Sequence, residues 1–152
     1  MSRTSRKERA PGAVPTQKDY ERLAEFRYAL RCFTAFSENA ARAAGLTPKQ
    51  HQALLAIKGM PSGADVTVGD LANQLLVRHN SAVELVNRLE QNGLLLRHHD
   101  GRDARRALLM LTPKGEAALL DLSAAHLEEL RRAGPEISSM LKAFVPAFGP
   151  PA

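Results

Sequence analysis

The sequence predicts a mainly α-helical fold with one two-stranded β-hairpin. Alanine and leucine dominate its apolar residues, with 24 Ala and 22 Leu against 7 Val and 2 Ile, and helices favour the first pair whereas strands favour β-branched residues. Two apolar runs of strand length, 94–99 and 105–111, flank a polar loop, 100–104, that contains Asp-Gly, which predicts the hairpin. At 152 residues, we expect one compact domain overall.

The two ends of the chain predict a tail and a helical dimerisation region. Residues 1–16 are rich in charge, Pro and Gly, and we expect a disordered basic tail because they cannot bury enough apolar surface to fold. Residues 17–47 and 113–147 carry apolar residues at helical steps of three and four. These stripes exceed what the lobe of residues 48–112 can cover, so they predict a homodimer. They consist of Leu23, Phe26, Leu30 and Phe33 near one end and Ile137, Met140, Leu141 and Phe144 near the other.

Two helix starts in the lobe carry capping signals. Thr47, followed by Pro48 and Gln50, forms a capping box with proline at the first helical position, which predicts a helix that ends near residue 59. Thr67 repeats this logic, with Asp70 supplying negative charge in the first turn.

A third helix follows after a tight turn. Asn80 and Ser81 are its predicted N-caps, Ser81 and Glu84 have the spacing of a capping box, and apolar residues line one face up to residue 93. Two short helices joined by a tight turn form a helix-turn-helix pattern. After the hairpin, Thr112-Pro113 predicts a further helix, which we expect the Gly-Pro pair at 134–135 to break.

Charge and composition narrow the class of partner. The formal net charge is +5 and the pI is near 9.8, which favours a polyanion, although residues 1–10 alone hold four basic side chains against one acidic. Aromatic residues make up only 5%, which disfavours a stacking-type single-strand binder. No apolar run reaches the ~18 residues of a membrane span and the start lacks the apolar core of a signal peptide. We therefore expect a cytoplasmic protein without membrane contact.

The sequence predicts no enzyme, no metal site and no cofactor. Its five histidines do not form the i, i+4 pair of a zinc protease, and neither a Gly-rich phosphate loop nor a nucleophile elbow occurs. The single cysteine, Cys32, permits no internal disulfide. We expect Cys32 to be a small buried hydrophobe beside Phe33 and Phe36 rather than a thiol sensor.

The order of helices, helix-turn-helix, hairpin and helix is the layout of a winged helix, and the sequence here resembles the MarR family of transcriptional regulators from about Asp19 to Phe144. The resemblance is carried by LANQL at 71–75, SAVELVNRLEQNGL at 81–94, DGRDAR at 100–105 and LTPKG at 111–115. The paired Asp-x-Arg repeat of the wing is the most specific of these motifs.

The resemblance implies a homodimer on double-stranded DNA, with the second helix of the motif in the major groove and each wing at a neighbouring minor groove. It further implies a regulator, such as a repressor that a small-molecule effector of unknown identity and unknown site releases from a palindromic operator, and a nucleoid-associated protein when bound. The expected DNA contacts are Arg78, His79, Asn80, Ser81 and Arg88 of the helix and Arg102, Arg105 and Arg106 of the wing, which Asp100 and Asp103 order. The Asn80 amide suits adenine, and Arg102 suits a narrow minor groove.

Several of these residues have a second interpretation. Asn80 and Ser81 can serve as caps only, and Glu84 places a carboxylate where many family members have a polar or basic residue, so it can repel DNA or reject a wrong base. Arg88 can be an ordinary solvent-exposed side chain. His98 and His99 adjoin the wing, and they can be exposed strand residues or DNA contacts. The alternative function is a winged-helix protein–protein interaction module whose non-specific DNA affinity comes from its basic tail.

Overall fold

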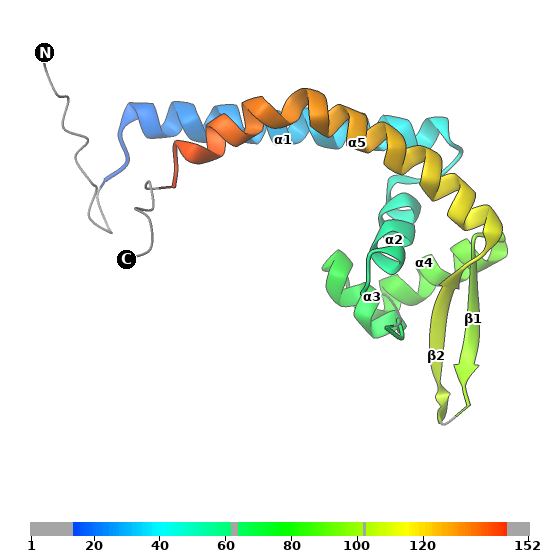
Figure 1. Cartoon of the computed structure of the whole chain (residues 1–152). Coiled ribbons are helices and arrows are strands. Elements are labelled where there is room, and N and C mark those ends of the chain that lie inside the picture. The colour runs from blue at the N-terminus through cyan, green and yellow to red at the C-terminus, as the bar shows by residue number, and fades with distance from the viewer. Residues whose placement is uncertain (1–13, 62–63, 102, 146–152) are drawn as a thin grey trace, which may run out of the picture. The chain divides into compact units, whose positions relative to one another are not determined.

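The described part of the chain, residues 14–61, 64–101 and 103–145 of this computed structural model, contains five helices and one hairpin (Figure 1). The helices are α1 (Gln17–Ala43), α2 (Pro48–Lys58), α3 (Val68–Leu75), α4 (His79–Gln91) and α5 (Pro113–Lys142). The strands are β1 (Leu95–Asp100) and β2 (Asp103–Leu111). Most of the predicted tail, the wing residue Arg102 and the side chains of Asp100, Asp103 and Arg105 lie outside the description.

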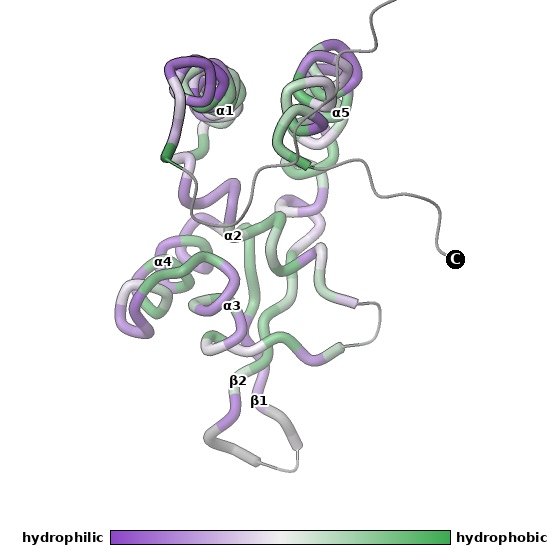
Figure 2. The backbone as a smooth tube through the Cα atoms, turned by 90° about the vertical axis from the view of Figure 1, so that its left-hand side faces the viewer, coloured by the Kyte–Doolittle hydropathy of each residue, from purple (hydrophilic) through white to green (hydrophobic). Residues whose placement is uncertain are grey.

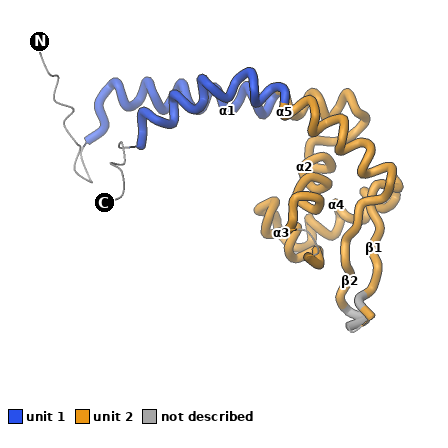
Figure 3. Tube along the Cα trace, viewed as in Figure 1, with its two compact units in different colours: residues 1–35, 128–152 blue, residues 36–127 orange. Residues whose placement is uncertain are grey.

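Residues 36–127 form a compact unit with an apolar core (Figure 3). The core includes fully buried side chains from four elements, each of which places one apolar face inward; they are Leu54 of α2, Leu71 of α3, Val86 and Leu89 of α4, and Leu95 of β1. Burying one such side chain contributes about 1.5–3 kcal/mol. Both strands are hydrophobic where they run beside the helices and more hydrophilic nearer the hairpin tip (Figure 2). The core therefore holds α4 and the base of the hairpin in one body.

The predicted caps of α2 and α3 are confirmed. Gln50 N–H donates to Thr47 Oγ1 at 3.1 Å, and Thr47 N–H donates back to Gln50 Oε1 at 3.0 Å. At α3, Asp70 N–H donates to Thr67 Oγ1 at 3.2 Å and Thr67 N–H donates to Asp70 Oδ2 at 2.9 Å. These bonds to Thr67 lower the pKa of the Asp70 carboxyl. Asp70 thus completes a full capping box rather than supplying charge alone.

The hairpin is antiparallel, with Leu95 opposite Leu111 and an irregularity between His99 and Asp100. Its pairing reaches Asp100 opposite Asp103, so the predicted loop of residues 100–104 was too long. Asp100 is thus part of the ladder, and a two-residue hairpin connection that begins with glycine is among the favoured ones, which explains the longer strands. On its other edge, β2 receives the segment before α3, because Leu109 N–H donates to the carbonyl oxygen of Val66 at 2.8 Å. Both edges of β2 are held at its base.

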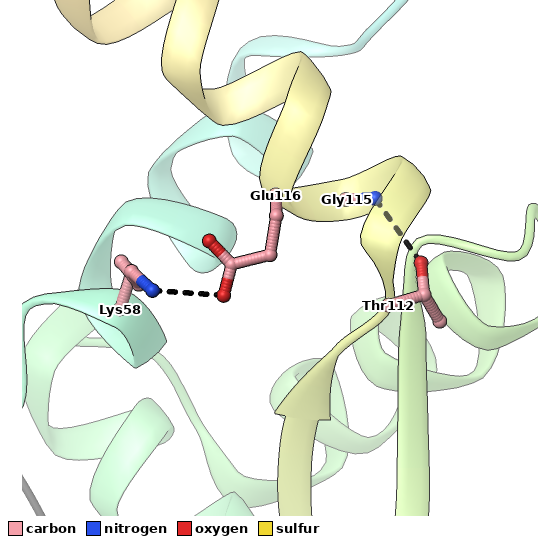
Figure 4. A network of polar contacts seen from close by, with 4 residues as sticks. All are labelled: Lys58, Thr112, Gly115 and Glu116. Atoms are coloured by element: carbon pink, nitrogen blue, oxygen red, sulfur yellow. Dashed lines mark hydrogen bonds and ion pairs between the residues drawn. The ribbon is translucent and has the colours of Figure 1, made fainter.

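The start of α5 packs tightly against the end of the helix-turn-helix. The Thr112 hydroxyl accepts the N–H of Gly115 at 3.1 Å and donates to the carbonyl oxygen of Gly93 at 2.6 Å, and Lys58 of α2 pairs with Glu116 at 2.8 Å (Figure 4). Gly115 is required here, because a Cβ would lie 2.1 Å from the carbonyl oxygen of Leu94. The predicted helix start at Thr112-Pro113 is therefore confirmed.

Residues 1–35 and 128–152 form the second unit (Figure 3). None of its described residues, 14–35 and 128–145, is buried. The rings of Phe26 and Phe144 meet edge-on with centroids 6.0 Å apart, yet Leu23, Leu30 and Leu141 remain 37–47% exposed. The apolar stripes of this unit thus lack a core of their own.

Two predictions for the ends of the chain were wrong. The pair Gly134-Pro135 does not break the last helix, since α5 continues through it to Lys142. A proline inside a helix removes one hydrogen bond and strains one turn, but the turns on either side retain their own bonds. Cys32 is exposed rather than buried, because it lies on a face of α1 that nothing in the described residues of its unit covers.

Candidate nucleic-acid interface

A sharp turn joins α3 to α4. Leu76 adopts left-handed backbone angles, φ 54° and ψ 43°, and the N–H groups of Leu76 and Val77 donate to the carbonyl oxygens of Asn73 at 3.3 Å and Ala72 at 3.1 Å. This pair of bonds is a Schellman motif, which ends a helix and redirects the chain at once. The next residue, Arg78, is already the extended N-cap of α4.

The start of α4 differs from the prediction. The helix begins at His79, so Asn80 and Ser81 lie within its first turn, and the predicted N-caps and Ser81–Glu84 capping box were wrong. The reason is the Schellman turn, which brings the chain into helical geometry two residues earlier than the capping pattern indicates. Arg78 makes no side-chain cap bond, so its side chain leaves the N–H groups of the first turn, at the positive end of the helix dipole, for another acceptor.

The predicted contact residues of this helix share one property, which is exposure. Arg78, His79, Asn80, Ser81 and Arg88 are all exposed. Exposed backbone N–H groups and cationic side chains at a helix start suit phosphate oxygens. Glu84 is also exposed, one turn before Arg88, and both line a groove of about 320 Å³ between α2 and α4. The acidic group therefore remains a local exception on a basic surface.

Arg97 of β1 joins the hairpin to α4, and sequence reasoning missed it. Its Nε donates to Glu90 Oε2 at 2.7 Å, and its Nη2 donates to Asn87 Oδ1. Both acceptors lie on α4, and Arg97 itself is half-buried. A guanidinium that bridges two side chains fixes orientation as well as distance. The alternation of the strand, with Arg97 between exposed Leu96 and His98, is the signal that could have found it.

The wing carries exposed basic groups. His98, His99 and Arg106 are exposed, and the Arg106 charge contributes to the lowered pKa of Asp70, so this arginine lies near the start of α3. Arg106 belongs to the same compact unit as α4. Arg102 and the side chains of Arg105, Asp100 and Asp103 lie outside the described residues.

His51 of α2 and His126 of α5 form a contact that spacing did not indicate. Their ring centroids are 4.8 Å apart, and His126 donates to the carbonyl oxygen of Leu122 at 2.6 Å while accepting the Ser37 hydroxyl at 2.8 Å, which assigns its tautomer. His51 is buried and its Nδ1 has no partner among the described atoms. Burial, and then the neighbouring His126, lower the pKa of His51. Over the residues that the structure describes, no group of three or more ligating side chains could hold a metal ion.

A helix-turn-helix followed by a hairpin that packs against its second helix defines the winged helix-turn-helix class of proteins. Within that class, residues 44–106 match the model of the MarR family. The resemblance found in the sequence is thus confirmed, since the winged-helix region of this chain matches the MarR family and the similar proteins named below are transcriptional regulators.

Similar proteins agree with this match. YsmB of Bacillus subtilis, an HTH-type transcriptional regulator, is 25% identical over 120 residues, which are 76% of this chain and 80% of YsmB. AbsC, a MarR family regulator from Streptomyces coelicolor, has a TM-score of 0.70 at 20% identity over 86% of this chain and 92% of AbsC. A mutant of Staphylococcus aureus MepR bound to an oligodeoxyribonucleotide has a TM-score of 0.64 at 18% identity. The match covers 86% of this chain and 100% of the MepR chain. These structures confirm the winged-helix fold.

Within the described ranges, no helix has the length and apolarity to cross a membrane.

Proposed function

We propose that this protein regulates transcription as a homodimer that binds a specific inverted-repeat operator in double-stranded DNA. One observation carries the proposal: the first turn of α4 is exposed, has no side-chain cap, and begins with Arg78 and His79. Free N–H groups, a helix dipole and cationic side chains at one end of a helix favour a polyanion. The core that joins α4 to the hairpin supports a second contact from the wing.

Each candidate residue has a proposed role in this interface. Asn80 pairs its amide with adenine, while Arg78, His79 and Ser81 meet phosphates and base edges at the helix start. Arg88 contacts a phosphate farther along the groove. On the wing, Arg102 enters the minor groove, Arg105 and Arg106 bind the backbone beside it, and Asp100 and Asp103 order the arginines.

The homodimer is proposed from the second unit, residues 1–35 and 128–152. Its described residues carry two apolar stripes but no buried side chain, and helices of this kind are stabilised by tertiary packing rather than by propensity. A second copy would supply the missing core for both chains. Light scattering at micromolar concentration should give twice the chain mass of 16.6 kDa, and a clean monomer would contradict the dimer.

The proposal extends to a repressor that an effector releases from DNA. The family resemblance supports this mode of regulation, in which a small molecule binds the protein and lowers its affinity for operator DNA. Its identity is a matter for screening against an isolated protein–operator complex.

Selection from a random duplex pool, followed by sequencing, tests the proposed function. We expect an inverted repeat whose half-sites lie about 10 base pairs apart, because two recognition helices related by a dyad must enter the major groove on one side. Inserting about 5 base pairs between the halves should abolish tight binding, since the half-sites then face opposite sides. A deletion of residues 1–15 should select the same repeat. Loss of all enrichment in that deletion would favour the protein–protein interaction module with a non-specific DNA-binding tail.

A further inference from the structure

Leu76, between α3 and α4, combines two unfavourable properties. Its φ of 54° is in the left-handed region, and no other residue besides glycine has a positive φ among those that the structure describes. Its side chain is 93% exposed. A Cβ in this region is crowded by the backbone, so the folded protein is less stable with leucine at this position than it would be with glycine.

The backbone of the turn explains the conformation but not the side chain. The Schellman bonds from Leu76 to Asn73 and from Val77 to Ala72 require a left-handed residue at this position. Glycine meets that requirement without steric conflict and is the usual residue there. The neighbouring residues are explained by packing, since Leu75 lies against the core and Val77 lines the groove beside α4.

Burial does not explain the leucine either. With 93% of its side chain in contact with solvent, Leu76 contributes almost nothing to the core of its unit. A single exposed leucine is ordinary. Here, however, the backbone strain lowers the stability of the folded protein, and no burial of the side chain compensates for it. A strained residue that the fold does not need points to a role in binding.

The surroundings of Leu76 indicate what it binds. The exposed side chains on either side are polar or basic, with Asn73 and Gln74 on the last turn of α3 and Arg78, His79 and Asn80 at the start of α4. Such a surface suits nucleic acid better than an apolar protein partner. The major groove offers one apolar feature to a leucine, which is the 5-methyl group of thymine.

We propose that Leu76 is a specificity-determining residue that contacts the 5-methyl group of a thymine in the operator. The inference rests on the proposed function and adds one base preference to it. In this arrangement, the Schellman turn presents Leu76 beside Arg78, so that one short segment contributes an apolar contact and a cationic contact to the same half-site.

Thymine-to-deoxyuridine substitution in the selected operator tests the contact one methyl group at a time. For the wild-type protein, we expect one thymine per half-site at which deoxyuridine weakens binding about threefold to fourfold, the value of one buried methyl group. Leu76→Gly should bind the intact operator more weakly by at least this factor and lose nothing further at that thymine. Leu76→Asn, which tolerates the left-handed backbone, should behave like Leu76→Gly.

Two controls complete the experiment: the stability of the Leu76 variant, and a substitution at a second exposed leucine. Leu76→Gly should unfold at a higher urea concentration than wild type, which shows that weaker binding does not come from damage to the fold. Leu55→Ala, at an exposed leucine of α2, should leave both affinity and the deoxyuridine effect unchanged.

Three results would overturn the proposal. Equal deoxyuridine losses at every thymine in wild type and Leu76→Gly would reject the methyl contact while leaving the operator intact. A changed oligomeric mass of Leu76→Gly with unchanged operator affinity would assign Leu76 to a protein contact. Failure of the wild-type protein to select any duplex would reject the proposed function itself, and the thymine contact with it.

Discussion

Replacing Gly115 by alanine should destabilise the fold by about 2–4 kcal/mol. Gly115 is buried in the first turn of α5, and an added Cβ would lie 2.1 Å from the carbonyl oxygen of Leu94, well inside the 3.0 Å that real Cβ atoms respect. The oxygen cannot move away freely, because it accepts the N–H of Thr112 at 3.1 Å and because Leu94 is itself buried.

The size of the stability loss in Gly115→Ala follows from the packing and the hydrogen bonds that the added Cβ would disturb. Overpacking a filled site costs about 1–3 kcal/mol, and weakening the hydrogen bond from Thr112 to Leu94 adds about 0.5–1.5 kcal/mol. The hydroxyl bond from Thr112 to Gly93, at 2.6 Å, ties the same strand end in place, so relaxation by sliding α5 would break a second bond. Together these effects give the expected loss.

Urea unfolding followed by far-UV circular dichroism measures this loss, at one fixed protein concentration because a dimer is proposed. Gly69→Ala is the matched control, since its Cβ would lie at an ordinary 3.7 Å from Thr67 Oγ1. Inside α3, that change should stabilise the protein by up to about 1 kcal/mol. A midpoint for Gly115→Ala at or above that of wild type would refute the reasoning.

Four further predictions concern the interface and the buried histidine. Arg97→Ala and Glu90→Ala should be non-additive by about 0.5–1 kcal/mol in a urea double-mutant cycle, since both side chains are partly exposed, 30% and 39%; additive losses would reject the pair. The folded state lowers the pKa of His51, so the unfolded chain binds the proton more readily, and stability should be complete above about pH 6.5 and fall as the pH drops below it. His51→Leu should flatten this dependence in urea unfolding between pH 7.5 and 5.5, and an unchanged slope would contradict the assignment. Asn80→Ser should keep the unfolding midpoint, because Asn80 is not a cap, but relax base preference at one operator position in a repeated selection; an identical preference would make Asn80 no reader. Arg102→Ala should weaken operator binding by about 1–3 kcal/mol in fluorescence anisotropy without changing the midpoint, and unchanged affinity would remove it from the interface.

Local signals predicted local structure well. Thr47 with Gln50 and Thr67 with Asp70 form their boxes because both partners lie within one turn of each other, and the bonds need no other part of the chain. The same rule failed at Ser81. The Schellman turn at Leu76 lets α4 begin at His79, two residues before Ser81, so Ser81 is not an N-cap. Considering the capping pattern at Ser81 alone does not reveal that the preceding Schellman turn competes with it to set the start of α4.

Tertiary contacts explain what the sequence could not predict. Arg97 reaches Asn87 and Glu90 only because the hairpin folds back beside α4. His51 and His126 meet through the packing of two helices that are far apart in sequence. Strand alternation indicates that Arg97 faces inward but not which side chains it meets, and no spacing marks the histidine pair, because both contacts depend on the arrangement of elements.

Thr112 is the one residue between β2 and α5, and its bonds to Gly93 and Gly115 deprive it of the backbone freedom that a hinge needs. The Lys58–Glu116 pair holds the following turn of α5 to α2. The hairpin and the first turns of α5 must therefore turn as a single lever. Any ligand that rotates these turns of α5 therefore turns the hairpin through the same angle, and the displacement of a strand residue grows with its distance from Thr112.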